Sequence, residues 1–161
     1  MRVALASDEP YPVHTVVAAL LEERGHVVVP FGSVAGGGEA PWAEVAEAAA
    51  LAVASGACDE GVFFCWTGTG ISMAANKVSG IRAALCTDAG TAAGARLWNH
   101  ANVLCLSNRL LSADMAREIV STWLDAAPGA QGNDGVERLR RVDARHRAPA
   151  ITPADTGVGR T

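Results

Sequence analysis

The sequence contains no apolar run long enough to cross a membrane, and the apolar segment at its start is too short for a signal peptide. Positive charge is also scarce, since the formal net charge is −4 and the isoelectric point lies near 5.5. A chain without an excess of basic residues has no broad field to attract a phosphate polymer. We therefore expect a cytoplasmic protein with no membrane and no nucleic acid among its partners.

Cysteine is infrequent, and its spacing fits neither a disulfide framework nor a zinc site. The four cysteines are far apart in the chain: Cys58, Cys65, Cys86 and Cys105. Three of them lie in apolar, strand-like runs, where a small buried thiol is common. We expect all four to be reduced and no metal to be bound.

Apolar residues make up 50% of the 161, which is enough for the core of one ordinary domain. Five short apolar runs read as strands. They span Arg2–Ser7, His26–Phe31, Gly61–Cys65, Ile81–Cys86 and Asn102–Leu106. Between and after them lie segments with helical periodicity or helix-capping residues, at Pro12–Arg24, Pro41–Ser55, Ser72–Lys77, 88–98 and 112–124.

Strands that alternate with helices at this spacing predict a parallel sheet covered on both faces, because parallel strands need helical crossovers. The predicted fold is α/β: a doubly wound, Rossmann-like three-layer α/β/α sandwich with a five-stranded parallel sheet. We expect a single domain over residues 1–143, a basic C-terminal element at about 136–147 and a disordered tail at 148–161.

Ligands of such sheets bind beyond the carboxyl ends of the strands. Four loops should therefore converge there: Ser7–Glu9, Cys65–Gly70, Thr87–Asp88 and Ser107–Arg109. The second loop, continued to Ser72, reads C-W-T-G-T-G-I-S and joins a strand to a helix. Its glycines allow successive backbone N–H groups to turn toward one point, which favours a negative oxygen. The loop lacks the lysine of a nucleotide-binding loop, so its pattern does not indicate a nucleotide. The negative oxygen could belong either to a bound phosphate or to an enediolate.

The segment Cys65–Leu85 resembles the type B ribose-5-phosphate isomerase and galactose-6-phosphate isomerase family, whose pattern is C-G-T-G-x-G, then S-x-A-A-N-K and G-I-R-A. Further matches are Ser7-Asp8, Asn99, Ala101–Leu104, Arg109 and Arg140–Asp143. The resemblance covers about residues 1–143. It is more specific than a G-x-G pattern alone.

The resemblance implies an aldose–ketose isomerase that moves a proton between adjacent carbons through an enediolate, with no metal and no organic cofactor. By position, Cys65 matches the family's proton-transfer cysteine and Thr67 its hydroxyl neighbour. The anion hole would be Gly68, Thr69, Gly70, Ile71 and Ser72. Substrate-binding positions would be Asp8, Glu9, Trp66, Trp98, Asn99, Arg109 and Arg141. The resemblance also implies a homodimer or tetramer with the site at the subunit boundary. The alternative for Cys65 is an inert core cysteine at a strand end.

Several positions depart from the family's pattern. Glu9 replaces a histidine and Glu137 an arginine, which weakens the attraction for a phosphate group. Trp98 stands at the position of the histidine that opens the sugar ring, and indole cannot transfer a proton in that way. His100, two residues on, is a possible substitute. Trp66 replaces a glycine.

The tryptophans and two further histidines also have structural interpretations. Trp42, with Trp66 and Trp98, either lines the site with apolar surface or merely packs. Trp123 is assigned to the core or to a subunit interface. His14 and His26 are expected to lie away from the strand ends and to have no role in the site.

Three functions follow as hypotheses. The first is a sugar-phosphate isomerase of the ribose-5-phosphate type. The second is a diverged isomerase or epimerase that acts on a non-phosphorylated, more apolar substrate in a specialised biosynthetic pathway. The third is a non-catalytic binding protein that retains the fold. The ligand in each case is a small sugar or sugar-phosphate-like molecule.

Overall fold

A computed structural model describes residues 1–146, and the tail predicted at 148–161 lies outside them. The strands are β1 (Arg2–Ser7), β2 (Val27–Gly32), β3 (Glu60–Cys65), β4 (Ala83–Leu85) and β5 (Val103–Ser107). The helices are α1 (Pro12–Glu23), α2 (Trp42–Ala54), α3 (Thr69–Ala75), α4 (Ala89–Asn99), α5 (Ala113–Asp125) and α6 (Asn133–His146), with short 3-10 helices η1 (Ser33–Ala35) and η2 (Ala130–Gly132). No helix of this part of the chain has both the length and the apolar character to span a membrane.

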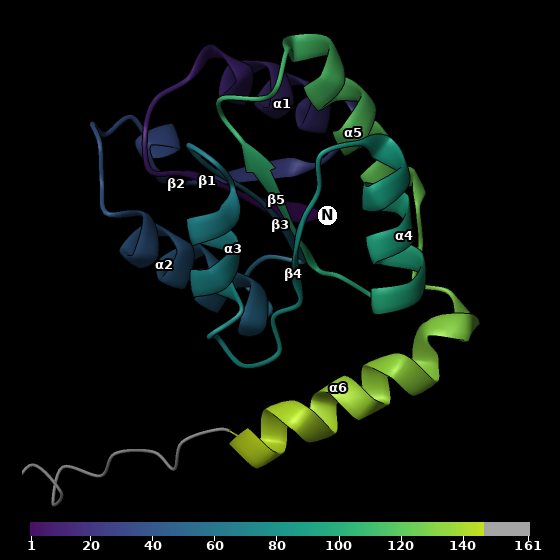
Figure 1. Cartoon of the computed structure of the whole chain (residues 1–161). Coiled ribbons are helices and arrows are strands. Elements are labelled where there is room, and N and C mark those ends of the chain that lie inside the picture. Colours follow the sequence, from purple (N-terminus) through teal and green to yellow (C-terminus); the bar gives the residue numbers. More distant parts are fainter. Residues whose placement is uncertain (147–161) are drawn as a thin grey trace, which may run out of the picture.

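The strands form one parallel sheet in the order β2-β1-β3-β5-β4 (Figure 1). Helical crossovers connect them, so the predicted doubly wound α/β sandwich is confirmed. In the register of the sheet, Ser7 pairs with Phe64 and Cys65 pairs with Ser107. The carboxyl ends of the three central strands therefore lie at one edge, as predicted.

Alternation along the strands produces two cores, one on each face of the sheet. Val3 and Leu5 of β1 point to the face covered by α1, α4 and α5, whereas Ala4 and Ala6 point to the face covered by α2 and α3 (Figure 1). Cys65 belongs to the second core. The four cysteines are all buried and free, as expected.

Local signals explain where most helices begin. Pro12 occupies the first turn of α1, where a missing N–H is harmless. The side chains of Asp88 and Ser112 accept hydrogen bonds from the N–H groups of Thr91 and Met115, at 2.7 and 3.2 Å, and cap α4 and α5 as predicted. The expected start of α3 at Ser72 is wrong, because Gly68 turns the chain at φ +77° and Thr69 is already helical.

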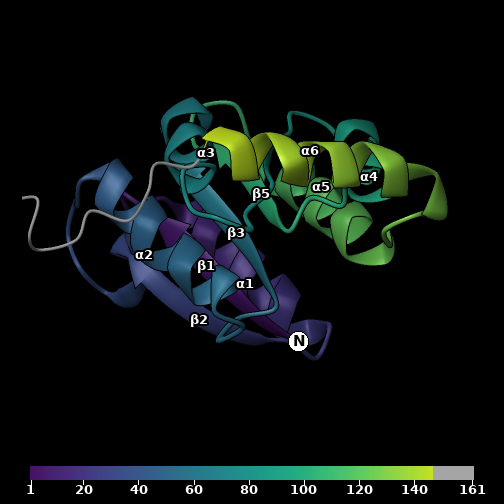
Figure 2. The ribbon, with the colours of Figure 1, turned by 90° about the horizontal axis from the view of Figure 1, so that it is seen from below.

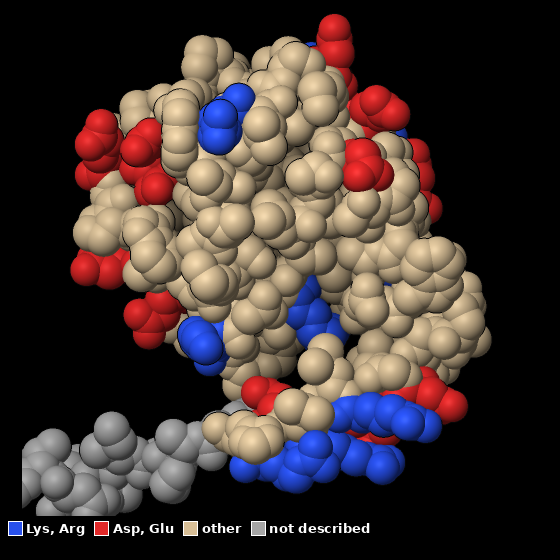
Figure 3. All heavy atoms as spheres, in the orientation of Figure 1, with Lys and Arg blue, Asp and Glu red and all other residues tan. Residues whose placement is uncertain are grey.

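The C-terminal helix α6 lies outside the sandwich and contacts α4 and η2 (Figures 1 and 2). Its basic side chains gather on one exposed side (Figure 3). Leu139 and Val142 are also exposed, and they line a hollow of about 750 Å³ between α6 and the loop that precedes β4. The helix thus presents both charge and apolar surface.

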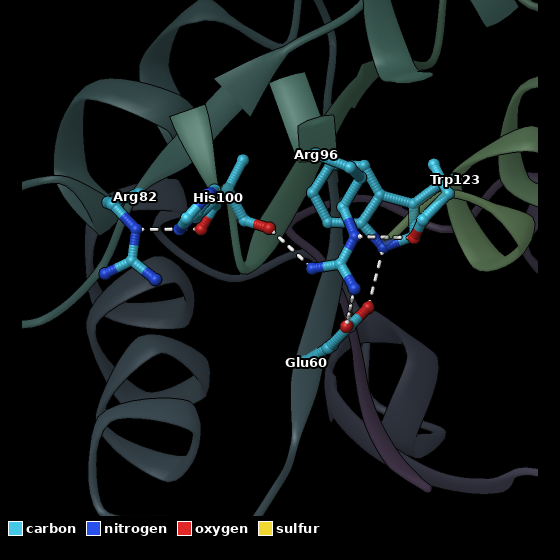
Figure 4. A network of polar contacts seen from close by, with 7 residues as sticks. Glu60, Arg82, Arg96, His100 and Trp123 are labelled. Carbon is cyan, nitrogen blue, oxygen red and sulfur yellow. Dashed lines mark hydrogen bonds and ion pairs between the residues drawn. The ribbon is translucent and has the colours of Figure 1, made fainter. Parts of the chain in front are cut away.

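A buried ion pair ties α4 to the start of β3 (Figure 4). The Glu60 carboxylate pairs with the Arg96 guanidinium and accepts a hydrogen bond of 2.8 Å from Nε1 of Trp123. Arg96 also lies over the Trp123 ring, at 4.9 Å from its centroid, and donates to the carbonyl of Ala101. Trp123 is fully buried, which confirms the core alternative predicted for it.

Candidate active site

The Cys65 loop is held to the end of β5 by its own backbone. The carbonyl of Cys65 accepts from the N–H of Asn108 at 2.9 Å, and the carbonyl of Trp66 accepts from the N–H of Arg109 at 3.2 Å. The Ser107 hydroxyl also donates to the Trp66 carbonyl, at 2.8 Å. Three hydrogen bonds from one neighbouring strand end therefore position the loop.

The Cys65 side chain is only 4% exposed and packs in the core under α2 and α3. Cys105 of the adjacent strand is fully buried, and burial raises the pKa of its thiol strongly. A hydrogen bond with Ser72 acts in the opposite direction, so Ser72 lies against Cys105. Burial likewise raises the pKa of Cys86, to about 11. Burial therefore disfavours the reactive thiolate form of Cys86 and Cys105.

Gly68 makes the sharp turn that begins the predicted anion hole. A side chain there would lie 2.6 Å from Leu85 and 3.0 Å from the backbone of Leu106, so glycine alone fits. The following first turn of α3 leaves the N–H groups of Thr69, Gly70 and Ile71 without carbonyl partners in the helix. The hydroxyls of Thr67 and Thr69 lie 2.6 Å apart beside them. This arrangement can hold a negative oxygen.

Asp8 and Glu9 follow the end of β1. Asp8 is 7% exposed, and its Oδ1 atom has no hydrogen-bond partner within residues 1–146. Burial raises the pKa of Asp8, and the nearby charges of Glu9 and Glu39 add to the increase, whereas backbone hydrogen bonds from Asp8 and Glu9 lower it. Glu9 accepts a hydrogen bond of 3.2 Å from the Tyr11 hydroxyl.

Trp66 lies between two neighbours at the mouth of the site and is 51% exposed. Its ring centroid is 6.1 Å from that of Tyr11 and 6.0 Å from the guanidinium carbon of Arg109. Tyr11 and Arg109 therefore lie beside Trp66 of the Cys65 loop, and Glu9 contacts Tyr11. Within residues 1–146, no group of three or more metal-ligating side chains is present.

Comparisons with known proteins identify the family. The family model described as Ribose/Galactose Isomerase matches residues 3–144. This chain belongs to that family. Ribose-5-phosphate isomerase B of Escherichia coli K12 is 38% identical over 133 residues, which cover 82% of this chain and 88% of that protein.

Solved structures of the Ribose/Galactose Isomerase family superpose over nearly the whole domain. Ribose-5-phosphate isomerase B of Clostridium thermocellum has a TM-score of 0.85 at 37% identity and covers 91% of this chain and 100% of its own. The same enzyme of Mycoplasma genitalium, determined with bound ribulose-5-phosphate, has a TM-score of 0.82 at 31% identity and covers 89% and 96%.

Three residues that the resemblance assigns to the site lie far from the Cys65 loop in the folded chain. Trp98 and Asn99 end α4, before β5 begins, so they lie at the edge of the sheet opposite Cys65. Trp98 is 57% exposed, and with Asn99 it lines a hollow of about 610 Å³ along α4 and β4. Arg141 lies on α6, where it pairs with Glu137 at 3.4 Å. A single chain therefore does not bring these side chains to the Cys65 loop.

His100 does not replace the ring-opening histidine within this chain. It ends α4 in the left-handed conformation, at φ +48°, and its Nε2 atom lies 2.9 Å from the carbonyl of Gly129. Its own carbonyl accepts from Arg82 at 2.8 Å (Figure 4). These contacts give His100 a structural role at the far edge of the sheet.

His14 is a residue of the site region that the sequence analysis misplaced. It is buried in α1, and its Nε2–H donates to Oδ1 of Asn108 at 2.8 Å, while its Nδ1 accepts from the N–H of Tyr11 at 3.4 Å. Asn108 also holds the Cys65 carbonyl. The expectation that His14 lies away from the strand ends is therefore wrong. Its position in an amphipathic helix gave no sign of a partner 94 residues away.

We expect His14→Gln to reduce the dependence of folding stability on pH. Burial lowers the pKa of His14 below its usual 6.5. At mildly acidic pH the imidazole is therefore protonated more fully in the unfolded chain than in the folded protein. The free energy of unfolding should fall as the pH is lowered below 6.5. Urea unfolding at pH 7.5 and 5.5 measures the difference. His146→Gln, at an exposed position, should lose as much stability between pH 7.5 and 5.5 as the unmodified protein. Equal losses of stability in all three proteins would refute the prediction.

Proposed function

We propose that this protein is an aldose–ketose isomerase that acts on a sugar phosphate of the ribose-5-phosphate type. The observation that supports it most is the position of the Cys65 thiol beside the first turn of α3, where Gly68 allows the N–H groups of Thr69 to Ile71 to face one point. A base next to an anion hole is what an enediolate intermediate requires.

In the proposed reaction, the Cys65 thiolate removes the proton from C2 of the open-chain aldose. Electrons of the broken C2–H bond form the C1–C2 double bond, and the negative charge moves to the former carbonyl oxygen. The N–H groups of the anion hole stabilise that oxygen. The thiol then returns the proton to C1, and a hydroxyl proton moves between O2 and O1 near Thr67. The product is the ketose, and no redox partner is needed.

Solvent deuterium exchange tests the proposal against its alternatives. We would incubate the protein in D₂O with ribose 5-phosphate, galactose 6-phosphate and the two unphosphorylated sugars. The proposal predicts deuterium at the carbon next to the carbonyl in a phosphorylated sugar. Exchange only in unphosphorylated sugars would instead support the diverged isomerase or epimerase. Absence of exchange in all four would support the non-catalytic binding protein.

We also propose that two copies of the chain form the complete site. The separation of Trp98, Asn99 and Arg141 from Cys65 within one chain supports this, as do the exposed apolar side chains of α6. Light scattering at micromolar concentration should give the mass of a dimer or a tetramer. A monomer at that concentration would contradict the proposal. The proposed location is the cytoplasm, because four unpaired cysteines are typical of reducing compartments.

Restoring basic residues should strengthen the binding of a phosphorylated substrate. The double change Glu9→His with Glu137→Arg replaces two carboxylates by groups that attract a dianion. We expect ribose 5-phosphate to bind at least about tenfold more tightly, equivalent to about 1.4 kcal/mol, by isothermal titration calorimetry.

Turnover of that double variant should stay low until Trp98→His supplies a group that can transfer a proton. If the unmodified protein already converts ribose 5-phosphate at an ordinary enzymatic rate, other residues compensate for Glu9, Glu137 and Trp98. That result would contradict this prediction and would refute the alternative of a diverged isomerase with a non-phosphorylated substrate. Glu118→Arg, at an exposed position of α5, makes the same change in charge as Glu137→Arg and serves as its control; it should leave the affinity unchanged.

A further inference from the structure

A pocket of about 360 Å³ beside the Cys65 loop is lined mainly by acidic and apolar residues. Its walls are Asp8, Glu9, Glu39, Ala40, Pro41 and Trp42. Three of the six carry carboxylates, and none carries a positive charge. Acidic side chains are prominent on this side of the molecule, over α2 and the loop before it (Figure 3). The pocket therefore has a negative potential that a neutral or anionic ligand would not offset.

One oxygen of the Asp8 carboxylate has no hydrogen-bond partner in the described part of the chain. Asp8 is only 7% exposed, and no hydrogen bond to its Oδ1 atom is present within residues 1–146. A buried polar atom without a partner is costly, and a bound donor commonly satisfies such an atom at a ligand site. Burial raises the pKa of Asp8, and the charges of Glu9 and Glu39 add to this, while backbone hydrogen bonds from Asp8 and Glu9 act in the opposite direction. A cation in the pocket would lower the energy of all three carboxylates.

The pocket adjoins the loop that carries the chemistry. A Cβ atom built on Gly70 would lie 3.2 Å from the indole ring of Trp42, so this ring is a wall shared by the pocket and the predicted anion hole. The indole is partly exposed and offers a ring face, which attracts cations. On the other side, Glu9 contacts Tyr11, which contacts Trp66 of the loop. The acidic pocket and the loop that begins at Cys65 are therefore neighbours.

We propose that the substrate carries a protonated amine at the end that enters the pocket of Asp8, Glu9 and Glu39, and is thus an amino sugar or amino sugar phosphate. A hydroxyl group would satisfy Oδ1 of Asp8 but would leave the three charges unbalanced, whereas an ammonium group supplies donors and charge together. The inference rests on the proposed isomerase function for the reaction, but binding of the amine does not depend on it.

Binding of matched amine and hydroxyl compounds tests the inference. Isothermal titration at pH 7 would compare 1-amino-1-deoxyribitol with ribitol, and 3-amino-3-deoxyribose with ribose. We expect at least one amine to bind tenfold or more tightly than its hydroxyl counterpart. Glu9→Gln and Glu39→Gln should each reduce that preference at least threefold. Glu47→Gln removes the same charge from an exposed position of α2 outside the pocket and should leave the preference intact.

Equal affinity for the amine and hydroxyl partners would overturn the inference, and so would a preference that neither Glu9→Gln nor Glu39→Gln reduces. The outcome is separable from that of the proposed function. An amine preference without deuterium exchange in any sugar supports the inference and contradicts the isomerase. Exchange in ribose 5-phosphate without an amine preference supports the isomerase and contradicts the inference.

Discussion

Cys65→Ala is expected to slow the exchange of solvent deuterium into substrate by about a hundredfold to ten-thousandfold. The thiol is the group that lies at the end of β3 beside the anion hole, and alanine cannot accept a proton. The fold should remain, because a small side chain in the core is exchanged for a smaller one. Mass spectrometry of the sugar measures the exchange, and circular dichroism checks the fold.

Cys58→Ala is the matched control for this prediction. Cys58 is buried in the same core, but it precedes β3 and so lies at the opposite edge of the sheet. Its removal should leave the exchange rate unchanged. If Cys65→Ala exchanges deuterium at the full rate, the base lies elsewhere and the proposed mechanism is wrong.

Glu60→Leu is expected to destabilise the protein by about 3–5 kcal/mol, because it leaves a buried cation without its counter-charge. The side chain of Arg96 is only 11% exposed, and Trp123 would also lose the acceptor of its Nε1 hydrogen bond. Urea unfolding followed by circular dichroism measures the change in the free energy of unfolding.

Two further variants show whether the unpaired charge causes the loss. Glu60→Leu combined with Arg96→Met removes both charges and should recover much of the stability, since an apolar pair of similar volume is often tolerated. Glu23→Leu removes one partner of the exposed pair between Glu23 and Arg117, which should cost less than about 1 kcal/mol. A loss for Glu60→Leu no larger than that for Glu23→Leu would contradict the account.

Much of the fold was predictable because its signals are local. Strand-like runs between helix caps such as Asp88 and Ser112 determine the order of elements, and parallel pairing then follows from the crossovers. The prediction was less accurate at α3, where the bend at Gly68 lets the helix start three residues early. A glycine in a loop does not reveal by itself which backbone conformation it adopts.

The candidate site was predictable only in part. The sequence predicts the Cys65 loop and Asp8 as site residues, because they follow strands and resemble a family motif. It did not identify the pair of His14 and Asn108, or the pair of Glu60 and Arg96. Each of these pairs joins residues far apart in sequence, and each carries no local motif. Such partners become apparent only when the packing of the helices on the sheet is known.

The opposite placement of the Cys65 loop and the Glu60 ion pair also bears on how this domain can evolve. Glu9, Trp66 and Trp42 are wholly or partly exposed around the loop, whereas the ion pair and most of the two cores lie under the helices. Mutations among the exposed residues would alter which molecule is selected and leave the folding framework nearly untouched. The domain therefore has the means to acquire a new substrate through successive point mutations without a compensating change elsewhere.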